Sequence, residues 1–148
     1  MVGNINIHNV TKNFDEVRVL NDFSLNIEPG SFVSLIGPSG CGKSTLLRIV
    51  GGLEKQFDGS VFLDGEKVTR AGSDRGFAFQ GSNLFPWLTV KNNIAFGLKA
   101  RGIYKDRKND VTDIINLVGL NGFENAFPHQ ISGGMQQRAS LARALVGH

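Results

Sequence analysis

One run of nine residues contains the residue types that bind phosphate groups. Glycines let a loop wrap around a polyphosphate and aim several backbone N–H groups at it, while a helix that follows points its positive end at the same anion. The run matches the pattern G-x-x-x-x-G-K-[ST], known as a P-loop. Its members are, in order, Gly37, Pro38, Ser39, Gly40, Cys41, Gly42, Lys43, Ser44 and Thr45.

The residue types at the end of this run predict two separate roles. Lys43 supplies a point charge for the outer phosphates, and the hydroxyl of Ser44 is a ligand suited to Mg²⁺. The competing interpretation is a glycine turn between a strand and a helix with no ligand. For Cys41 two interpretations remain open, a thiol that reagents modify to block nucleotide, or simply a small residue in the loop.

A second segment, Ile131–Arg138, opens a helix with Ser132, Gly133 and Gly134. A capped helix start of this kind is another anion-binding end. One nucleotide has little use for two such ends from one subunit, so a head-to-tail dimer in which this end faces the partner's γ-phosphate is a natural arrangement. The alternative is an ordinary helix cap.

The elements around these motifs follow from periodicity. Alternating apolar residues predict strands near Ile5–Ile7 and Phe23–Ile27, and the apolar run Ser31–Ile36 predicts a buried strand before the P-loop. Further strands are expected at Ser60–Leu63, turned by Asp64-Gly65, and at Gly76–Phe79. Helices are expected over residues 43–50, 89–100 with Thr89 as cap, 106–118, and from Ser132 to the end of the chain.

The chain resembles the ATP-binding domains of ABC transporters. Ile131–Arg138 is similar to the family's LSGGQ signature, with Ile131 for Leu and Met135 for Gln. The resemblance implies that Gln80 is the Q-loop glutamine near Mg²⁺ and the attacking water, and that Phe14 stacks on adenine. A core position is the competing interpretation for Phe14.

The resemblance implies an α/β P-loop NTPase fold with an N-terminal antiparallel β subdomain and a helical subdomain. Residues 1–80 would form the β subdomain and P-loop core, 81–134 the Q-loop and helical subdomain, and 135–148 the helix after the signature. It also implies ATP and Mg²⁺ as ligands, and a partner subunit contacted through Ser132, Gly133, Gly134 and Gln136.

The segment Leu84–Val90 and the SGGM form of the signature resemble the nitrate, sulfonate and taurine importers in particular. The region Phe85–Trp87 is then expected to meet a transmembrane permease, with burial inside the domain as the alternative. A solute-binding protein would be an indirect partner. A non-transport ABC ATPase and a degenerate cassette that holds nucleotide without cleaving it are the other functions considered.

The family pattern continues with a Walker B aspartate, a catalytic glutamate and a switch histidine, and no acidic residue follows Glu124 in these 148 residues. We therefore expect the C-terminal part of the sheet to be missing and the 148-residue chain itself to be inactive as an ATPase. Val61–Asp64 has a Walker B appearance, but Gly65 follows and the position is too early, so a hairpin turn is expected.

The composition of the chain limits its possible partners and its location less strongly than the motifs do. The net charge is +3 with scattered Lys and Arg, so no nucleic-acid partner is expected. A single cysteine excludes an internal disulfide and fits a reducing compartment. No signal peptide is evident and no apolar run approaches the roughly 20 residues of a membrane span. We expect a cytoplasmic protein, attached to the membrane only through the permease.

Overall fold

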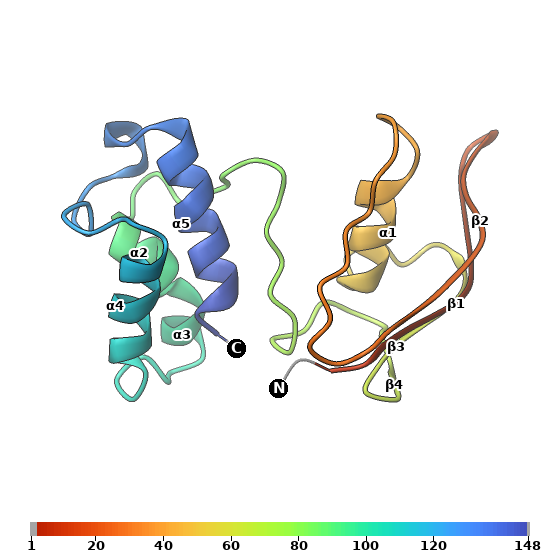
Figure 1. Cartoon of the computed structure of the whole chain (residues 1–148), viewed down its shortest axis with the longest axis horizontal. Coiled ribbons are helices and arrows are strands. Elements are labelled where there is room, and N and C mark those ends of the chain that lie inside the picture. Colours follow the sequence, from red (N-terminus) through yellow and green to blue (C-terminus); the bar gives the residue numbers. More distant parts are fainter. Residues whose placement is uncertain (1–2, 148) are drawn as a thin grey trace. The chain divides into compact units, whose positions relative to one another are not determined.

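The computed structural model describes residues 3–147, which divide into two compact units (Figure 1). The first unit ends at Arg75 and contains a β-sheet, one helix and the P-loop. The second begins at Gly76 and is helical. Each unit has its own buried apolar cluster, as independent compact units require.

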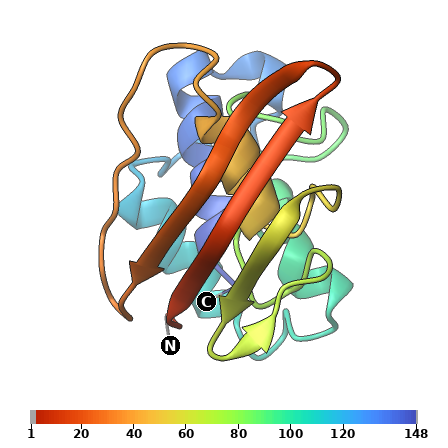
Figure 2. The ribbon, with the colours of Figure 1, turned by 90° about the vertical axis from the view of Figure 1, so that its right-hand side faces the viewer.

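The first unit is built on a four-stranded antiparallel sheet in the order β2-β1-β3-β4 (Figure 2). Its strands are β1 (Ile5–Phe14), β2 (Val17–Ile27), β3 (Asp58–Leu63) and β4 (Glu66–Lys67). Ile5 on β1 lies opposite Ile27 on one side and Leu63 on the other, so β1 is the central strand of the long part of the sheet. The N-terminal strands are confirmed.

Helix α1 (Lys43–Val50) covers one face of this sheet (Figure 2). Its buried residues Leu46 and Ile49 pack with Val10 of β1 and Val61 of β3. The apolar face of the helix and the alternating apolar residues of the strands thus meet in one core. This packing fixes the helix that begins at the P-loop against the sheet.

The residues Val61–Asp64 end in a tight turn between β3 and β4. Asp64 has φ of 52° and Gly65 has φ of 83°, the two positive values of the hairpin turn that Asp-Gly favours. The hairpin interpretation is therefore confirmed, and Asp64 is not a Walker B residue.

Two predicted strands are wrong in this structure. Ser31–Ile36 and Gly76–Phe79 have no strand conformation, and the side chains of Phe32 and Ile36 are 96% and 92% exposed. A strand exists only where a neighbouring strand accepts and donates its backbone hydrogen bonds. Among the described residues no strand pairs with either segment, so their apolar composition alone does not form a ladder.

The second unit consists of α2 (Val90–Ile94), α3 (Phe96–Ala100), α4 (Lys108–Leu117), the short 3₁₀ helix η1 (Pro128–Gln130) and α5 (Gly133–Leu145). Helix α2 packs against α4 and α5. The core includes Ile94, Leu98, Val111, Ile115, Leu120, Ala139 and Ala142. No helix of residues 3–147 is both long and apolar enough to cross a membrane.

The helical predictions are confirmed with one correction. Thr89 caps α2 as expected, with its hydroxyl accepting a hydrogen bond from the N–H of Asn92 at 3.3 Å. The segment 89–100 is not one helix, however, because α2 ends and α3 begins at Ala95. The helix expected over 106–118 corresponds to α4, and the one expected after Ser132 corresponds to α5.

Candidate nucleotide-binding site

The P-loop leads directly into α1 through a buried glycine. Gly42 is the N-cap residue with φ of 91°, and its carbonyl accepts a hydrogen bond from the N–H of Leu46 at 2.8 Å. A Cβ atom on Gly42 would lie 2.8 Å from the carbonyl oxygen of Val19 on β2. Glycine is therefore required here both for its backbone angles and for the close approach that fixes the loop against the sheet.

The ammonium group of Lys43 lies against the loop that precedes it. Lys43 Nζ donates to the carbonyl oxygens of Gly37 at 2.8 Å and Pro38 at 2.6 Å, and contacts the sulfur of Cys41 at 3.4 Å. A positive charge is thus held beside the loop at the start of α1, where the helix end adds its own positive potential. This combination suits a polyphosphate.

The hydroxyl-bearing residues begin α1. Ser44 is exposed and Thr45 is half-buried, so the Ser44 hydroxyl is accessible for a metal ion bound to phosphates. Residues 3–147 contain no group of three His, Cys, Asp or Glu side chains arranged for a metal. A Mg²⁺ that takes phosphate oxygens, water and one hydroxyl needs no such group, and the donor type fits this hard cation.

The other predicted residues of the nucleotide site are accessible to solvent. Phe14 ends β1 with 45% of its surface exposed, which does not fit the alternative of a core residue. Gln80 is exposed in an irregular segment of the second unit. The roles of both residues stay predictions.

The start of α5 has the predicted cap. Ser132 has extended backbone angles, and its hydroxyl accepts a hydrogen bond from the N–H of Met135 at 3.3 Å. Gly133 and Gly134 are exposed, and a Cβ on either would meet nothing within 4 Å. Among residues 3–147, both glycines at the start of α5 are therefore exposed and have open space where a side chain would begin.

The side chain of Gln136, which was predicted as a residue of a partner's site, is hydrogen-bonded at both ends. Its Nε2 donates to the carbonyl oxygen of Pro128 at 2.9 Å, and its Oε1 accepts from the Ser82 hydroxyl at 2.9 Å. Both ends of the side chain are thus bonded inside the second unit. The role of Gln136 in a partner's site stays a prediction, as do those of Ser132, Gly133 and Gly134.

Asn93 organises the region of Phe85–Trp87 and was not predicted. This asparagine is fully buried, and its Oδ1 accepts from the N–H of Phe85 at 2.7 Å. Its Nδ2 donates to the carbonyl oxygens of Phe85, Leu88 and Thr89 at 3.1, 2.9 and 3.1 Å. The sequence signal that could have indicated this buried role is the position of Asn93, which shares one helix face with the apolar residues Val90 and Ile94.

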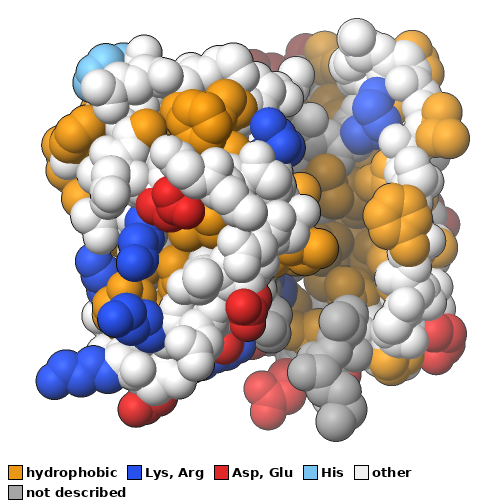
Figure 3. Space-filling view, turned by 60° about the vertical axis from the view of Figure 1, so that its left-hand side comes forward, with side chains coloured by type: hydrophobic (Ala, Val, Ile, Leu, Met, Phe, Trp, Pro, Cys, Tyr) orange, Lys and Arg blue, Asp and Glu red, His pale blue; other side chains and the backbone are white. Residues whose placement is uncertain are grey.

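The segment held by Asn93 presents aromatic rings at the surface. Trp87 is 70% exposed, and Phe85 packs between Trp87 and Phe96 with ring centroids 5.4 and 4.6 Å away. The guanidinium of Arg143 lies 5.4 Å from the Phe85 ring, and partial burial lowers its pKa from the ordinary value. In Figure 3, hydrophobic side chains reach the surface of the second unit in separate patches.

Comparison with known proteins identifies the family of this chain. Residues 20–148 match the family model described as ABC transporter. The aliphatic sulfonates import ATP-binding protein of Bacillus thuringiensis subsp. konkukian is 47% identical over 146 residues, which are 96% of this chain and 57% of that protein. The nitrate import ATP-binding protein of Synechocystis is 45% identical over 133 residues, covering 89% of this chain and 50% of that protein.

A solved structure supports the same assignment. A dimeric ATP-binding cassette in a post-hydrolysis state, bound to ADP and phosphate, superimposes with a TM-score of 0.83 and 36% identity. The match covers 97% of this chain and 69% of that one. The chain belongs to the ABC transporter ATP-binding family, and it spans 57% and 50% of the length of the two relatives described above.

Proposed function

We propose that this chain is the nucleotide-binding part of the ATP-binding subunit of an ABC importer, whose ATP hydrolysis drives uptake of a small solute. The observation that carries the proposal is the Lys43 ammonium, held beside a glycine loop at the start of α1. A fixed charge and a helix N-terminus in one place form the chemistry that recognises polyphosphates.

Within this proposal the described residues divide the work of binding ATP with Mg²⁺. The backbone of Gly37–Thr45 surrounds the phosphates, Lys43 neutralises their charge, and Ser44 is a ligand of the metal. Gln80 is the second contact of the metal, and it also orients the attacking water. The Phe14 ring stacks on adenine, for which its 45% exposure leaves room.

A second subunit completes the site in this proposal. The capped start of α5, with Ser132, Gly133 and Gly134, faces the γ-phosphate held by the partner in a head-to-tail dimer. The open space beside both glycines supports this assignment, because an added Cβ at either position meets no atom within 4 Å.

The membrane partners are proposed from surface chemistry and from the relatives. A permease contacts the aromatic residues around Phe85–Trp87, for which the 70% exposure of Trp87 is the supporting observation. The subunit then lies on the cytoplasmic face of the membrane, and a solute-binding protein acts on the far side. The relatives are named for sulfonates and for nitrate, so a small anion such as nitrate, a sulfonate or taurine is the proposed solute.

Nucleotide binding is tested in the intact protein by titration calorimetry with ATP·Mg²⁺ and with inorganic triphosphate. Lys43→Met is expected to weaken both at least ~100-fold, since a charge-assisted contact to phosphate is lost from the centre of the site. Lys67→Met is the matched control, because Lys67 is an exposed lysine of the same unit. Equal affinities for the two variants would refute the P-loop assignment.

The partner contact is tested with Gly133→Leu in the intact protein. The substitution enters open space, so the fold and ATP binding by the single subunit are expected to remain. The leucine would block the partner's phosphates, and we expect ATP-dependent dimerisation and hydrolysis to fall to background. Undiminished hydrolysis by this variant would exclude a site shared between subunits.

A further inference from the structure

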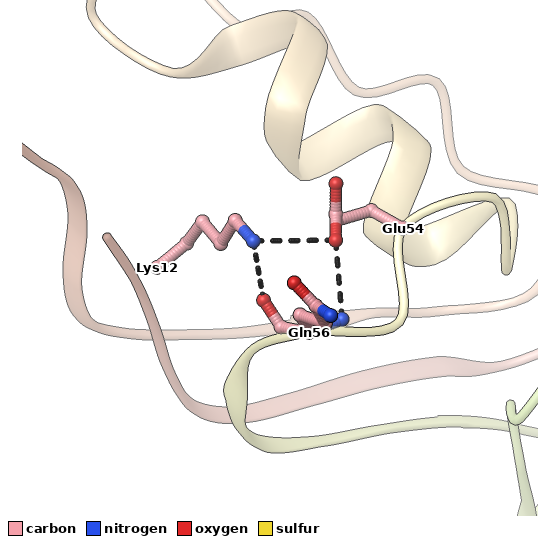
Figure 4. Close-up of polar contacts among 3 residues, drawn as sticks. All are labelled: Lys12, Glu54 and Gln56. Atoms are coloured by element: carbon pink, nitrogen blue, oxygen red, sulfur yellow. Dashed lines mark hydrogen bonds and ion pairs between the residues drawn. The ribbon is translucent and has the colours of Figure 1, made fainter. Parts of the chain in front are cut away.

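Lys12 is a buried lysine at the end of the central strand β1. It is 5% exposed, and its ammonium donates to Glu54 Oε1 at 3.2 Å and to the carbonyl oxygen of Gln56 at 2.6 Å (Figure 4). Lysine is almost never buried unless it is paired. The buried ammonium has two hydrogen-bond partners from one short segment, so its position within this unit is fixed.

The carboxylate of Glu54 is arranged to remain ionised beside Lys12. The N–H of Gln56 donates to Glu54 Oε1 at 3.1 Å (Figure 4). This backbone hydrogen bond and then the nearby ammonium of Lys12 lower the pKa of Glu54 against the opposing effect of burial. The Glu54 carboxylate therefore stays ionised at neutral pH, and its contact with Lys12 Nζ helps to fix the position of that ammonium.

The same ammonium covers one face of the Phe14 ring. Lys12 Nζ lies 4.5 Å from the ring centroid, within the range of a cation–π interaction. The two residues are two positions apart on β1, so their side chains emerge on the same side of the strand. Phe14 keeps 45% of its surface exposed, so an ammonium on one face leaves much of the ring open to a ligand.

The two residues that bind the Lys12 ammonium, Glu54 and Gln56, lie in the segment that follows α1. The N–H of Glu54 donates to the carbonyl oxygen of Arg48 in α1 at 3.2 Å. Lys12 is paired across the sheet with Leu20, and the P-loop residue Gly42 packs against Leu20 and its neighbour Val19. The Phe14 ring is thus positioned with reference to the same helix and strand that fix the P-loop.

We propose that Lys12 is a positioning residue for the base of the bound nucleotide, which holds the Phe14 ring at a fixed place relative to the P-loop. The proposal rests on the proposed function. It assigns Lys12 no contact with the phosphates. Removing its charge is therefore expected to weaken recognition of the base and to leave recognition of the phosphates unchanged.

The test compares ATP with inorganic triphosphate, which lacks the base, by titration calorimetry of the intact protein. Lys12→Gln removes the charge but retains an amide that can donate to the carbonyl of Gln56. We expect roughly 3- to 10-fold weaker binding of ATP, the range of one cation–π contact, and unchanged binding of triphosphate. Lys12→Arg retains a cation and is expected to restore ATP affinity. Lys67→Gln, at an exposed lysine of β4, is the control.

Two further variants keep the test decisive. If Lys12→Gln does not fold, the double variant Lys12→Gln with Glu54→Gln removes both charges of the pair and serves in its place. In a Phe14→Ala background, the change at Lys12 is expected to have no effect on the ratio of ATP to triphosphate affinity, because the ring through which it acts is gone.

The outcomes separate the two proposals. A selective loss of ATP affinity that disappears without Phe14 supports the role of Lys12. An equal loss for ATP and triphosphate, or no loss for either, overturns it while the P-loop assignment stands. If the wild-type protein binds neither ligand, the proposed function fails, and the role of Lys12 fails with it.

Discussion

Ser82 and Gln136, 54 residues apart in the chain, are joined by a hydrogen bond in which the Ser82 hydroxyl donates to Gln136 Oε1 at 2.9 Å. The other end of the same amide donates to Pro128 in the turn before α5. One side chain therefore connects the segment that follows Gln80 to the turn that leads to Ser132.

Truncating this amide is expected to destabilise the second unit. Gln136→Ala leaves a carbonyl and a hydroxyl without their partner, and we expect a loss of about 1–3 kcal/mol in the free energy of unfolding. Gln137→Ala, at the exposed neighbour on the same helix, is expected to change it by less than about 0.5 kcal/mol. Chemical denaturation of both variants measures the difference, and equal stabilities would contradict it.

Substitutions at two glycines of the P-loop distinguish the cost of backbone strain from the cost of steric contact. Gly40 and Gly42 both have positive φ, of 82° and 91°, but only Gly42 has a neighbour within 4 Å of its added Cβ. Gly40→Ala is expected to cost about 1–2 kcal/mol of folding stability, the cost of a left-handed backbone. Gly42→Ala adds a contact with Val19 and is expected to cost a further 1–3 kcal/mol or so. Thermal unfolding without nucleotide measures both, and a smaller loss for Gly42→Ala would contradict the packing.

The buried amide of Asn93 is expected to be the most sensitive polar position of the second unit. Asn93→Ala removes its hydrogen bonds to the segment Phe85–Thr89, and we expect a loss of about 2–4 kcal/mol. The segment should also become more mobile, which tryptophan fluorescence quenching at Trp87 measures. Asn92→Ala is the control, since Asn92 Oδ1 only accepts from Lys99 at an exposed site. Similar losses for both variants would refute a special role for Asn93.

The Glu54 carboxylate predicts a loss of stability in acid. Its pKa is lower in the folded protein than in the unfolded chain because the Gln56 N–H and then Lys12 stabilise the ionised form. Such a group stabilises the fold fully above the ordinary glutamate pKa of roughly 4.3, and this contribution is lost as pH falls through the lower folded-state value.

The measurement is the stability of the wild type minus that of Glu54→Gln as a function of pH. The difference is expected to be constant near neutral pH and to shrink in acid below about pH 4. Glu66→Gln serves as the control, because Glu66 is exposed and makes no ion pair among residues 3–147. A difference that stays constant down to pH 2 would contradict the ionic role of Glu54.

Local sequence rules predicted those parts of the fold that depend on local forces. The cap at Ser132, the cap at Thr89 and the turn at Asp64-Gly65 each depend on one or two side chains and their own backbone. The P-loop followed by α1 is of the same kind. These features were therefore predictable from residue types and spacing.

The failures lie where a distant part of the chain decides the outcome. Whether Ser31–Ile36 is a strand depends on a neighbouring strand, and its apolar side chains carry no information about that neighbour. Contacts that no prediction covered are of the same kind: Gln136 bonds to Ser82, and the buried ammonium of Lys12 bonds to Glu54, 42 residues further along. Spacing along the chain did not indicate these contacts.

The contacts of Lys43 with its own loop also bear on the entropy of binding the proposed polyphosphate ligand. A free lysine side chain has about 2 kcal/mol of rotamer entropy. Hydrogen bonds to Gly37 and Pro38 restrict that freedom when the protein folds, before any anion arrives. Under the proposed function, an incoming polyphosphate would meet an ammonium that is already ordered, so that less side-chain entropy would be lost on association than for a lysine that moves freely in water.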